Sequence, residues 1–348
     1  MASRPWAQKA LQFTGAWQLT RGRGITVAVI DSGVDYSPQL AHKVRAISLT
    51  GRGLQDCVGH GTAVAGIIAA ADQRAQGMPF VGVAPDASIL SIKVDSTRSG
   101  TSATLAKGIR YAVHWHAKVI NISSTTRDSP ELRAAVRYAL RRNVVVVAAA
   151  GNDTPNKKGP FYPASYPGVI SVGAVSASGA LAPFSDRHSQ VAVTAPGANV
   201  TSAWPGGYQA GLSGTSFAAP FVSGVAALVR ARFPRLTAAQ VARRIEATAN
   251  GGTGPGTGNG LVNAVQAVSA ILPSGARPGA SHAIGGPVSV ARPSAPPRTQ
   301  SRIALGITAA SLAAALLAGI AAVVISQGRR RRWRPGRVGF RPDDSAPS

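Results

Sequence analysis

Several absences limit what this chain can be. Cys57 is the only cysteine in 348 residues, which excludes an intrachain disulfide and a cysteine-based metal cluster. The chain has no zinc-finger spacing and no RNA-binding aromatic motif, so we expect no nucleic-acid partner, no metal and no other cofactor. Because Cys57 lies three residues before His60, we expect it to be a small packing residue near the site.

Acidic residues are also scarce. The chain has 13 Asp and Glu against 37 Lys and Arg, which gives a formal net charge of +24. Residues 273–348 contribute +9 of this charge and residues 1–272 contribute +15. Such a chain can bind anionic lipid, nucleic acid or an acidic partner, or simply present a solvated basic surface. We favour the solvated surface.

Long apolar runs are missing from all but one part of the chain. Residues 1–23 have no such run, and we expect no secretory signal there. Residues 303–325 carry no charge and are long enough to cross a bilayer, although a buried helix of a soluble domain is the alternative. The arginine cluster at 329–334 predicts a cytoplasmic C-terminus, a catalytic domain outside the cell and contact with anionic lipid.

Changes in composition along the chain define the predicted domains. We expect an N-terminal segment 1–23, a folded domain 24–272, a linker 273–302 rich in Pro, Gly, Ser and Arg, a membrane span 303–325 and a basic tail 326–348. Within the domain, predicted strands lie at 25–30, 87–94, 118–123, 144–149, 169–175 and 191–195. Predicted helices lie at 62–71, 101–116, 131–142, 216–233 and 237–249. The alternation predicts an α/β fold, with a mostly parallel sheet covered by helices on both faces.

Three motifs contain the polar groups of an acyl-transfer site. Asp31 follows an apolar run, His60 lies in Gly59-His60-Gly61-Thr62, and Ser216 lies in Gly214-Thr215-Ser216. A serine hydroxyl becomes a strong nucleophile when a histidine takes its proton and a carboxylate orients that histidine. The order Asp, His, Ser along the chain is that of a subtilisin-type triad.

Two further residues complete the predicted site. Asn152 follows a predicted strand, and its amide together with the backbone N–H of Ser216 can stabilise an oxyanion. Pro220 is compatible with the helix after Ser216 if it falls in the first turn, and otherwise it should kink that helix. Each motif alone is common in proteins, but their joint occurrence in this order favours a serine protease.

These motifs resemble the subtilisin-like serine proteases, or subtilases, and the similarity runs from about residue 17 to 268. The segments that carry it include AVIDSGVD, GHGTAVAGIIAA, VVVVAAAGN and LSGTSFAAPFVSGVAAL. The resemblance implies a three-layer subtilisin-like fold, the triad Asp31, His60 and Ser216, and Asn152 as the oxyanion residue. It also implies that substrate binds between segments near 95–101 and 123–126. The residues expected to bind substrate are Asp95, Gly100, Ser123, Ser124 and Thr125.

The linker, the apolar run and the basic tail are similar to those of one branch, the mycosins, which are membrane-anchored proteases associated with type VII secretion. This implies an endopeptidase that acts on polypeptides at the cell membrane, with secretion-complex proteins as partners. An alternative is a structural component that stabilises a secretion complex, with catalysis secondary. A third hypothesis is a lipid- or DNA-binding protein that acts through its positive charge.

Overall fold

The structure is a computed structural model that describes residues 4–95, 101–153, 159–187, 189–252 and 254–272. The chain divides into two compact units, Met1–Gly279 and Ala280–Ser348, and every described residue belongs to the first. The predicted linker, membrane span and basic tail lie outside the described residues. Within the described part, no helix combines the length and hydropathy needed to cross a bilayer.

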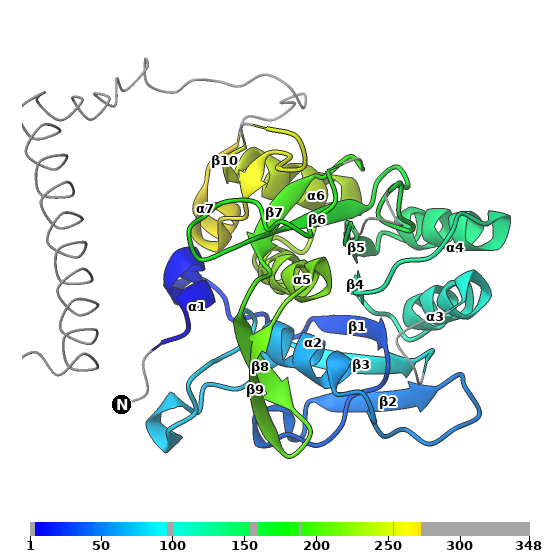
Figure 1. Ribbon diagram of the computed structural model, residues 1–348, viewed down its shortest axis with the longest axis horizontal. Coiled ribbons are helices and arrows are strands. Elements are labelled where there is room, and N and C mark those ends of the chain that lie inside the picture. Colours follow the sequence, from blue (N-terminus) through cyan, green and yellow to red (C-terminus); the bar gives the residue numbers. More distant parts are fainter. Residues whose placement is uncertain (1–3, 96–100, 154–158, 188, 253, 273–348) are drawn as a thin grey trace, which may run out of the picture. The chain divides into compact units, whose positions relative to one another are not determined.

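One large sheet forms the centre of the described unit (Figure 1). Its strand order is β10-β11-β7-β6-β5-β4-β1-β3-β2, and all neighbouring pairs are parallel except β10 with β11. The strands are β1 Thr26–Asp31, β2 Val44–Ser48, β3 Ser88–Lys93, β4 Val119–Ile122, β5 Val145–Ala149, β6 Ile170–Val175, β7 Val193–Pro196, β10 Asn250–Gly251 and β11 Gly260–Leu261. A separate antiparallel hairpin contains β8 Val200–Trp204 and β9 Gly207–Leu212.

The central strands are mostly apolar because they are buried on both faces. In β1, Val27 and Val29 belong to one hydrophobic core, whereas Ala28 and Ile30 belong to a second core. Successive side chains of a strand point to opposite faces, so a continuous apolar run supplies both cores. The prediction of a mostly parallel sheet buried between helices is therefore confirmed.

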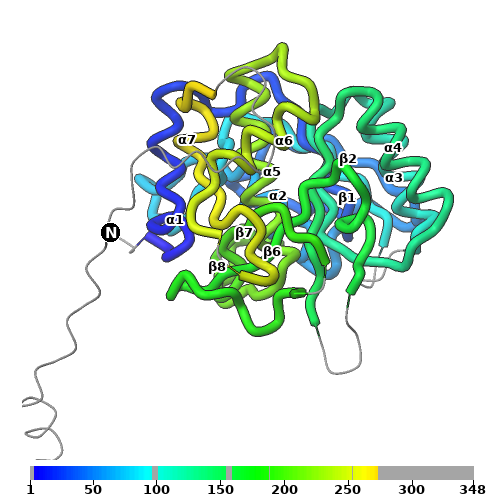
Figure 2. The backbone as a smooth tube through the Cα atoms, turned by 90° about the horizontal axis from the view of Figure 1, so that it is seen from above, coloured from blue at the N-terminus to red at the C-terminus, as the bar shows by residue number. Residues whose placement is uncertain are grey.

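Helices cover the two faces. The helices are α1 Trp6–Leu11, α2 His60–Ala69, α3 Ser102–His114, α4 Pro130–Arg141, α5 Thr215–Arg232, α6 Ala238–Ala247 and α7 Ala264–Ser269. Residues of α2 and α5 pack into the core that contains Val27, and residues of α3 and α4 pack into the core that contains Ile30. Figure 2 shows α3 and α4 along one side of the described unit and α1 and α7 along the other.

Local signals account for several helix starts. Thr237 caps α6: its side chain accepts a hydrogen bond from the Gln240 backbone N–H, and the Gln240 side-chain oxygen accepts one from the Thr237 backbone N–H. This reciprocal pair satisfies two backbone N–H groups that the first helical turn leaves without partners. Ser129 caps α4 with its own side chain, which accepts from the Leu132 backbone N–H, and it lies directly before a proline that suits the first helical position.

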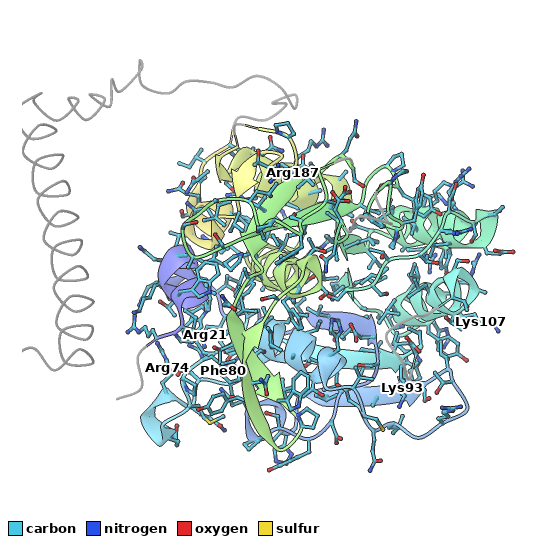
Figure 3. The ribbon with its side chains drawn as sticks, viewed as in Figure 1. Arg21, Arg74, Phe80, Lys93, Lys107 and Arg187 are labelled. Carbon is cyan, nitrogen blue, oxygen red and sulfur yellow. The ribbon has the colours of Figure 1, made fainter. Side chains whose placement is uncertain are left out.

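The segment before β1 packs against the domain. Phe13 is completely buried, and the indole Nε1 of Trp17 donates to the Val83 carbonyl at 2.9 Å. Arg21 and Arg74, labelled in Figure 3, both lie over the Trp17 ring, at 4.5 and 5.9 Å from its centroid. Cation–π contacts of this kind join the N-terminal segment to the loop after α2.

Candidate active site

The candidate residues meet at the carboxyl edge of the sheet. From β1 the sheet is built outward in both directions, with β3 on one side and β4 on the other. Open α/β sheets bind ligands at such a switch point, beyond the carboxyl ends of the strands. A cavity of about 600 Å³ lies there. Its lining includes predicted residues from the ends of four strands and the starts of two helices: Asp31, His60, Asp95, Ser123, Ser124, Thr125, Asn152 and Ser216.

Asp31 and His60 form a close pair. Asp31 Oδ1 lies 2.8 Å from His60 Nδ1, and their side chains are 5% and 15% exposed. The backbone N–H of Ser32 donates to the same oxygen at 2.8 Å. A carboxylate only accepts hydrogen bonds, so the imidazole proton belongs on Nδ1 and the basic lone pair on Nε2. Phe217 lies beside the imidazole, with ring centroids 5.1 Å apart.

Helix α2 begins at His60, two residues before the predicted start. The sequence disfavours a helix there because glycine flanks the histidine on both sides. The structure needs one of these glycines for close approach: a Cβ on Gly61 would stand 2.0 Å from the Gly33 carbonyl oxygen. The start of α2 can therefore lie directly against the loop that follows β1, which brings His60 to Asp31.

A buried carboxylate that the sequence analysis missed organises this helix start. Asp56 is 2% exposed. Its two oxygens accept hydrogen bonds from the Ser32 hydroxyl, from the backbone N–H groups of Val58, Gly59 and Thr62, and from the Thr62 hydroxyl. The Ser32 hydroxyl in turn accepts from the Gly61 amide at 3.0 Å. The signal that could have found Asp56 is an acidic residue a few positions before a helix start.

The expectation for Cys57 is wrong. Cys57 is exposed, and the neighbouring Asp56 is the buried residue of this loop. The difference has a physical reason: burying a thiol here would gain some apolar area, whereas Asp56 satisfies several backbone donors at the helix start at once.

We expect Asp56→Ala to lower the free energy of unfolding by about 3 kcal/mol, because it leaves buried N–H and O–H donors without an acceptor. Urea or thermal unfolding measures the change. Asp72→Ala is the matched control, since Asp72 is an exposed carboxylate paired with the nearby Arg74, and we expect it to change stability by less than about 0.5 kcal/mol. An Asp56→Ala protein as stable as Asp72→Ala would contradict a structural role for this carboxylate.

Ser216 and Asn152 converge beside Gly214. The position that a Cβ on Gly214 would take lies 3.0 Å from Ser216 Oγ, 3.4 Å from Asn152 Nδ2 and 3.7 Å from the Ser216 amide nitrogen. Gly214 has φ +150°, which suits glycine. Asn152 Oδ1 accepts from the Thr215 amide at 3.0 Å and from the Thr215 hydroxyl at 2.8 Å. With Oδ1 engaged in this way, Nδ2 is the amide atom that lies near the Gly214 Cβ position, as does Ser216 Oγ.

The segment after β4 forms another wall of the cavity. Ser123, Ser124 and Thr125 all line it, and the backbone of Thr126 pairs with Tyr162 at 2.8 and 3.2 Å.

A buried tyrosine lies slightly further along the chain. The Tyr166 hydroxyl donates to Asp128 Oδ1 at 2.5 Å. Burial, reinforced by this hydrogen bond, raises the pKa of Tyr166 to about 12, so the phenol remains a donor at all ordinary pH values.

Two other predicted features have different outcomes. Asp95 follows β3 and lines the cavity, whereas Gly100 lies outside the described residues. The hairpin β8–β9, which the sequence analysis missed, also contributes to the wall through Trp204, Gly211 and Leu212. The described residues contain no cluster of three or more His, Cys, Asp or Glu side chains arranged for a metal ion.

The fold and the residues that line the cavity are those of a serine protease of the subtilisin type. Comparison with known proteins leads to the same class of protein. The model of the subtilase family matches residues 22–285. The chain therefore belongs to the subtilase family. Subtilisin E of Bacillus subtilis is 41% identical over 256 aligned residues, which cover 71% of this chain and 66% of that protein.

Within the family, the chain is similar to mycosins. Mycosin-4 of Mycobacterium tuberculosis is 40% identical over an alignment 380 positions long, which covers 94% of this chain and 82% of the relative. The crystal structure of MycP1 with its N-terminal propeptide removed has a TM-score of 0.72 at 35% identity and covers 78% of this chain and 100% of that one. The MycP3 protease from the type VII (ESX-3) secretion system has a TM-score of 0.70 at 36% identity and covers 78% and 89%.

Proposed function

We propose that this chain is a membrane-anchored serine endopeptidase in which Asp31, His60 and Ser216 are the catalytic triad. The observation that carries the proposal is the 2.8 Å contact between Asp31 Oδ1 and His60 Nδ1 in a cavity that Ser216 also lines. Its substrate is a polypeptide bound in that cavity, with Asp95, Gly100, Ser123, Ser124 and Thr125 as the contributing residues.

In the proposed reaction, His60 accepts the proton of Ser216 Oγ as that oxygen attacks the peptide carbonyl carbon. Asp31 keeps the imidazole in the required tautomer and stabilises the imidazolium that forms. The same proton then passes to the leaving amine, and the acyl group stays on Ser216. Water deacylates the enzyme by the reverse sequence, with His60 again as the base.

The negative charge that develops on the carbonyl oxygen needs donors already in position. Asn152 Nδ2 and the Ser216 amide lie around the same point beside Gly214, and both can donate to an oxyanion there. Ser216 is the second residue of α5, where the helix dipole also favours negative charge. Such donors stabilise the transition state without the reorganisation that water would require.

We expect Asn152→Ala to lower kcat by about 10²–10³-fold and to change KM by less than about threefold, because the donor acts mainly on the transition state. Steady-state hydrolysis of a fluorogenic peptide measures both constants. Asn259→Ala is the control, since this exposed asparagine bonds to the Ala192 carbonyl and is not among the residues lining the cavity. A loss confined to KM would argue against an oxyanion role.

The proposed anchor is the uncharged run 303–325, followed by a basic cytoplasmic tail. The apolar length matches a bilayer core, and the arginines after it set the orientation. The mycosin relatives support a link to a type VII secretion system, because MycP3 is described as a protease of such a system. Secretion-complex proteins are then the partners at the membrane, together with anionic lipid at the tail.

A membrane-impermeant fluorophosphonate probe tests activity and topology together. We expect it to label wild-type protein on intact cells, to leave Ser216→Ala unlabelled, and to follow the protein into the medium when residues 303–348 are removed. Labelling only after lysis would overturn the proposed topology. A folded wild-type protein that is unlabelled both before and after lysis would instead overturn the proposed triad and favour a structural role.

A further inference from the structure

Pro220 lies inside the helix that carries Ser216. It is the sixth residue of α5, beyond the first turn. In a regular α-helix the carbonyl of residue i accepts from the N–H of residue i+4. For the Ser216 carbonyl that donor would be Pro220, which has no N–H. The helix itself therefore cannot provide the usual donor to the carbonyl of the proposed nucleophile.

A side chain from the sheet supplies the missing donor. The hydroxyl of Ser123, which follows β4, donates to the Ser216 carbonyl at 2.8 Å. Ser123 is 4% exposed, so this hydrogen bond is protected from competition by water. A buried carbonyl without a partner is costly, which explains why a donor is present where the proline removes one.

Two further side chains continue the network. The Ser123 hydroxyl accepts from Asn121 Nδ2 at 2.9 Å, and Asn121 Oδ1 accepts from the Ser223 hydroxyl at 2.8 Å. Asn121 and Ser223 are both completely buried. Asn121 is a polar residue in a strand whose other members are all apolar, and Ser223 lies seven positions after Ser216, on the same face of α5.

The hydrogen bonds of this network are all donated toward the Ser216 carbonyl. If the Asn121 amide were reversed, its oxygen would take the Ser123 proton, and the Ser216 carbonyl would lose its donor. In the structure the Ser223 hydroxyl donates to Oδ1, which leaves Nδ2 to donate to Ser123. The order of donation is therefore Ser223 to Asn121, Asn121 to Ser123, and Ser123 to the carbonyl of Ser216.

The consequence is that Ser216 is held on both sides. The amide and hydroxyl of the preceding residue, Thr215, bond to Asn152 after β5, and the carbonyl of Ser216 bonds to Ser123 after β4. The orientation of the peptide units around a residue sets the direction of its Cα–Cβ bond, and so the direction of Ser216 Oγ. A misplacement near 1 Å at a reacting atom can cost about 10²-fold in rate.

We propose that Asn121, Ser123 and Ser223 are positioning residues that replace the helical donor lost at Pro220 and so aim Ser216 Oγ and its amide. This inference rests on the proposed role of Ser216 as nucleophile. It is separate from the contribution of Ser123 to substrate binding, because it uses the Ser123 hydroxyl, which contacts Asn121 Nδ2 and the Ser216 carbonyl. Their loss should therefore act on the chemical step.

The test measures kcat, KM and the rate of reaction with a fluorophosphonate, all well below the melting temperature of each variant. We expect Ser123→Ala to lower kcat and the fluorophosphonate rate together by about 10–100-fold, with KM changed by less than about threefold. Ser123→Thr keeps a hydroxyl and should recover most of this loss. Ser171→Ala is the matched control: it removes a hydroxyl that is 1% exposed in strand β6 of the same sheet and has no hydrogen-bond partner among the described residues. It should stay within about twofold of wild type.

Ser223→Ala decides whether the three residues act as one unit. We expect it to lower kcat by about 3–10-fold, and we expect the double variant with Ser123→Ala to fall no further than Ser123→Ala alone, because groups of one network are not additive. Losses that multiply, or a Ser123→Ala loss confined to KM, would overturn the proposal. Mapping the fluorophosphonate adduct in wild-type protein keeps the outcomes separate, since an adduct elsewhere than Ser216 would overturn the proposed triad instead.

Discussion

Ser216→Ala should abolish peptide hydrolysis while leaving the protein folded. We expect kcat to fall by about 10⁶-fold, which is the size of loss seen when the serine of a related triad is removed. The reason is that the acyl-enzyme can no longer form, and the remaining donors can only assist direct attack by water. The substitution should not disturb the fold, because the hydrogen bond between Ser216 and Ser123 uses the backbone carbonyl of Ser216.

A fluorogenic peptide library and the fluorophosphonate probe measure this loss whatever peptide sequence the enzyme prefers. Ser178→Ala is the control, since Ser178 is an exposed residue of the turn after β6 whose hydroxyl bonds to that of Ser176. It should retain full activity. Hydrolysis by Ser216→Ala within tenfold of the wild-type rate would show that another group is the nucleophile.

Asp31→Ala should have the second largest effect, a loss of about 10⁴-fold in kcat. The carboxylate provides the acceptor for His60 Nδ1–H at 2.8 Å and the negative charge that stabilises the imidazolium. Asp31→Asn separates these two contributions. Because the Ser32 amide also donates to Oδ1, the asparagine oxygen should occupy that position and keep the proton on Nδ1. We still expect at least a 10²-fold loss, since the neutral amide cannot stabilise the cation.

The measurement is kcat for a fluorogenic peptide, together with thermal unfolding to show that each variant is folded. Asp35→Ala is the matched control from the same loop, because its carboxylate bonds to the backbone amide of Tyr36 at 2.7 Å and is not among the groups lining the cavity. We expect it to remain within about twofold of wild type. Full activity in Asp31→Asn would mean that His60 needs no carboxylate.

The sequence by itself was sufficient for the layered α/β architecture. Parallel strands buried on both faces are nearly continuous apolar runs, so the interior of β1 and the whole of β5 stand out in the sequence. Local chemistry also identified the start of α6, because Thr237 and Gln240 satisfy backbone donors within one turn. In contrast, β2 pairs along the edge of the sheet and is only partly buried, and its weaker pattern was missed for that reason.

The candidate site residues could likewise be predicted from the sequence, because each is a polar residue in a short motif at the end of an apolar run or at the start of a predicted helix. Asp31, His60, Asn152 and Ser216 each lie at the end of a strand or the start of a helix, and the structure brings them to one cavity. Their proximity follows from the topology, since parallel strands place their carboxyl ends at the same edge.

Tertiary structure alone decided how these residues are supported. Asp56 bonds locally to Val58, Gly59 and Thr62, but the Ser32 hydroxyl that completes its set of partners lies 24 positions away. The network that reaches the Ser216 carbonyl joins residues 93 and 102 positions apart. The physical reason is that local patterns report only which face of an element is buried. Which donor meets which acceptor depends on how distant elements pack, and in this chain that packing supplied the hydrogen bond that Pro220 removes from its own helix.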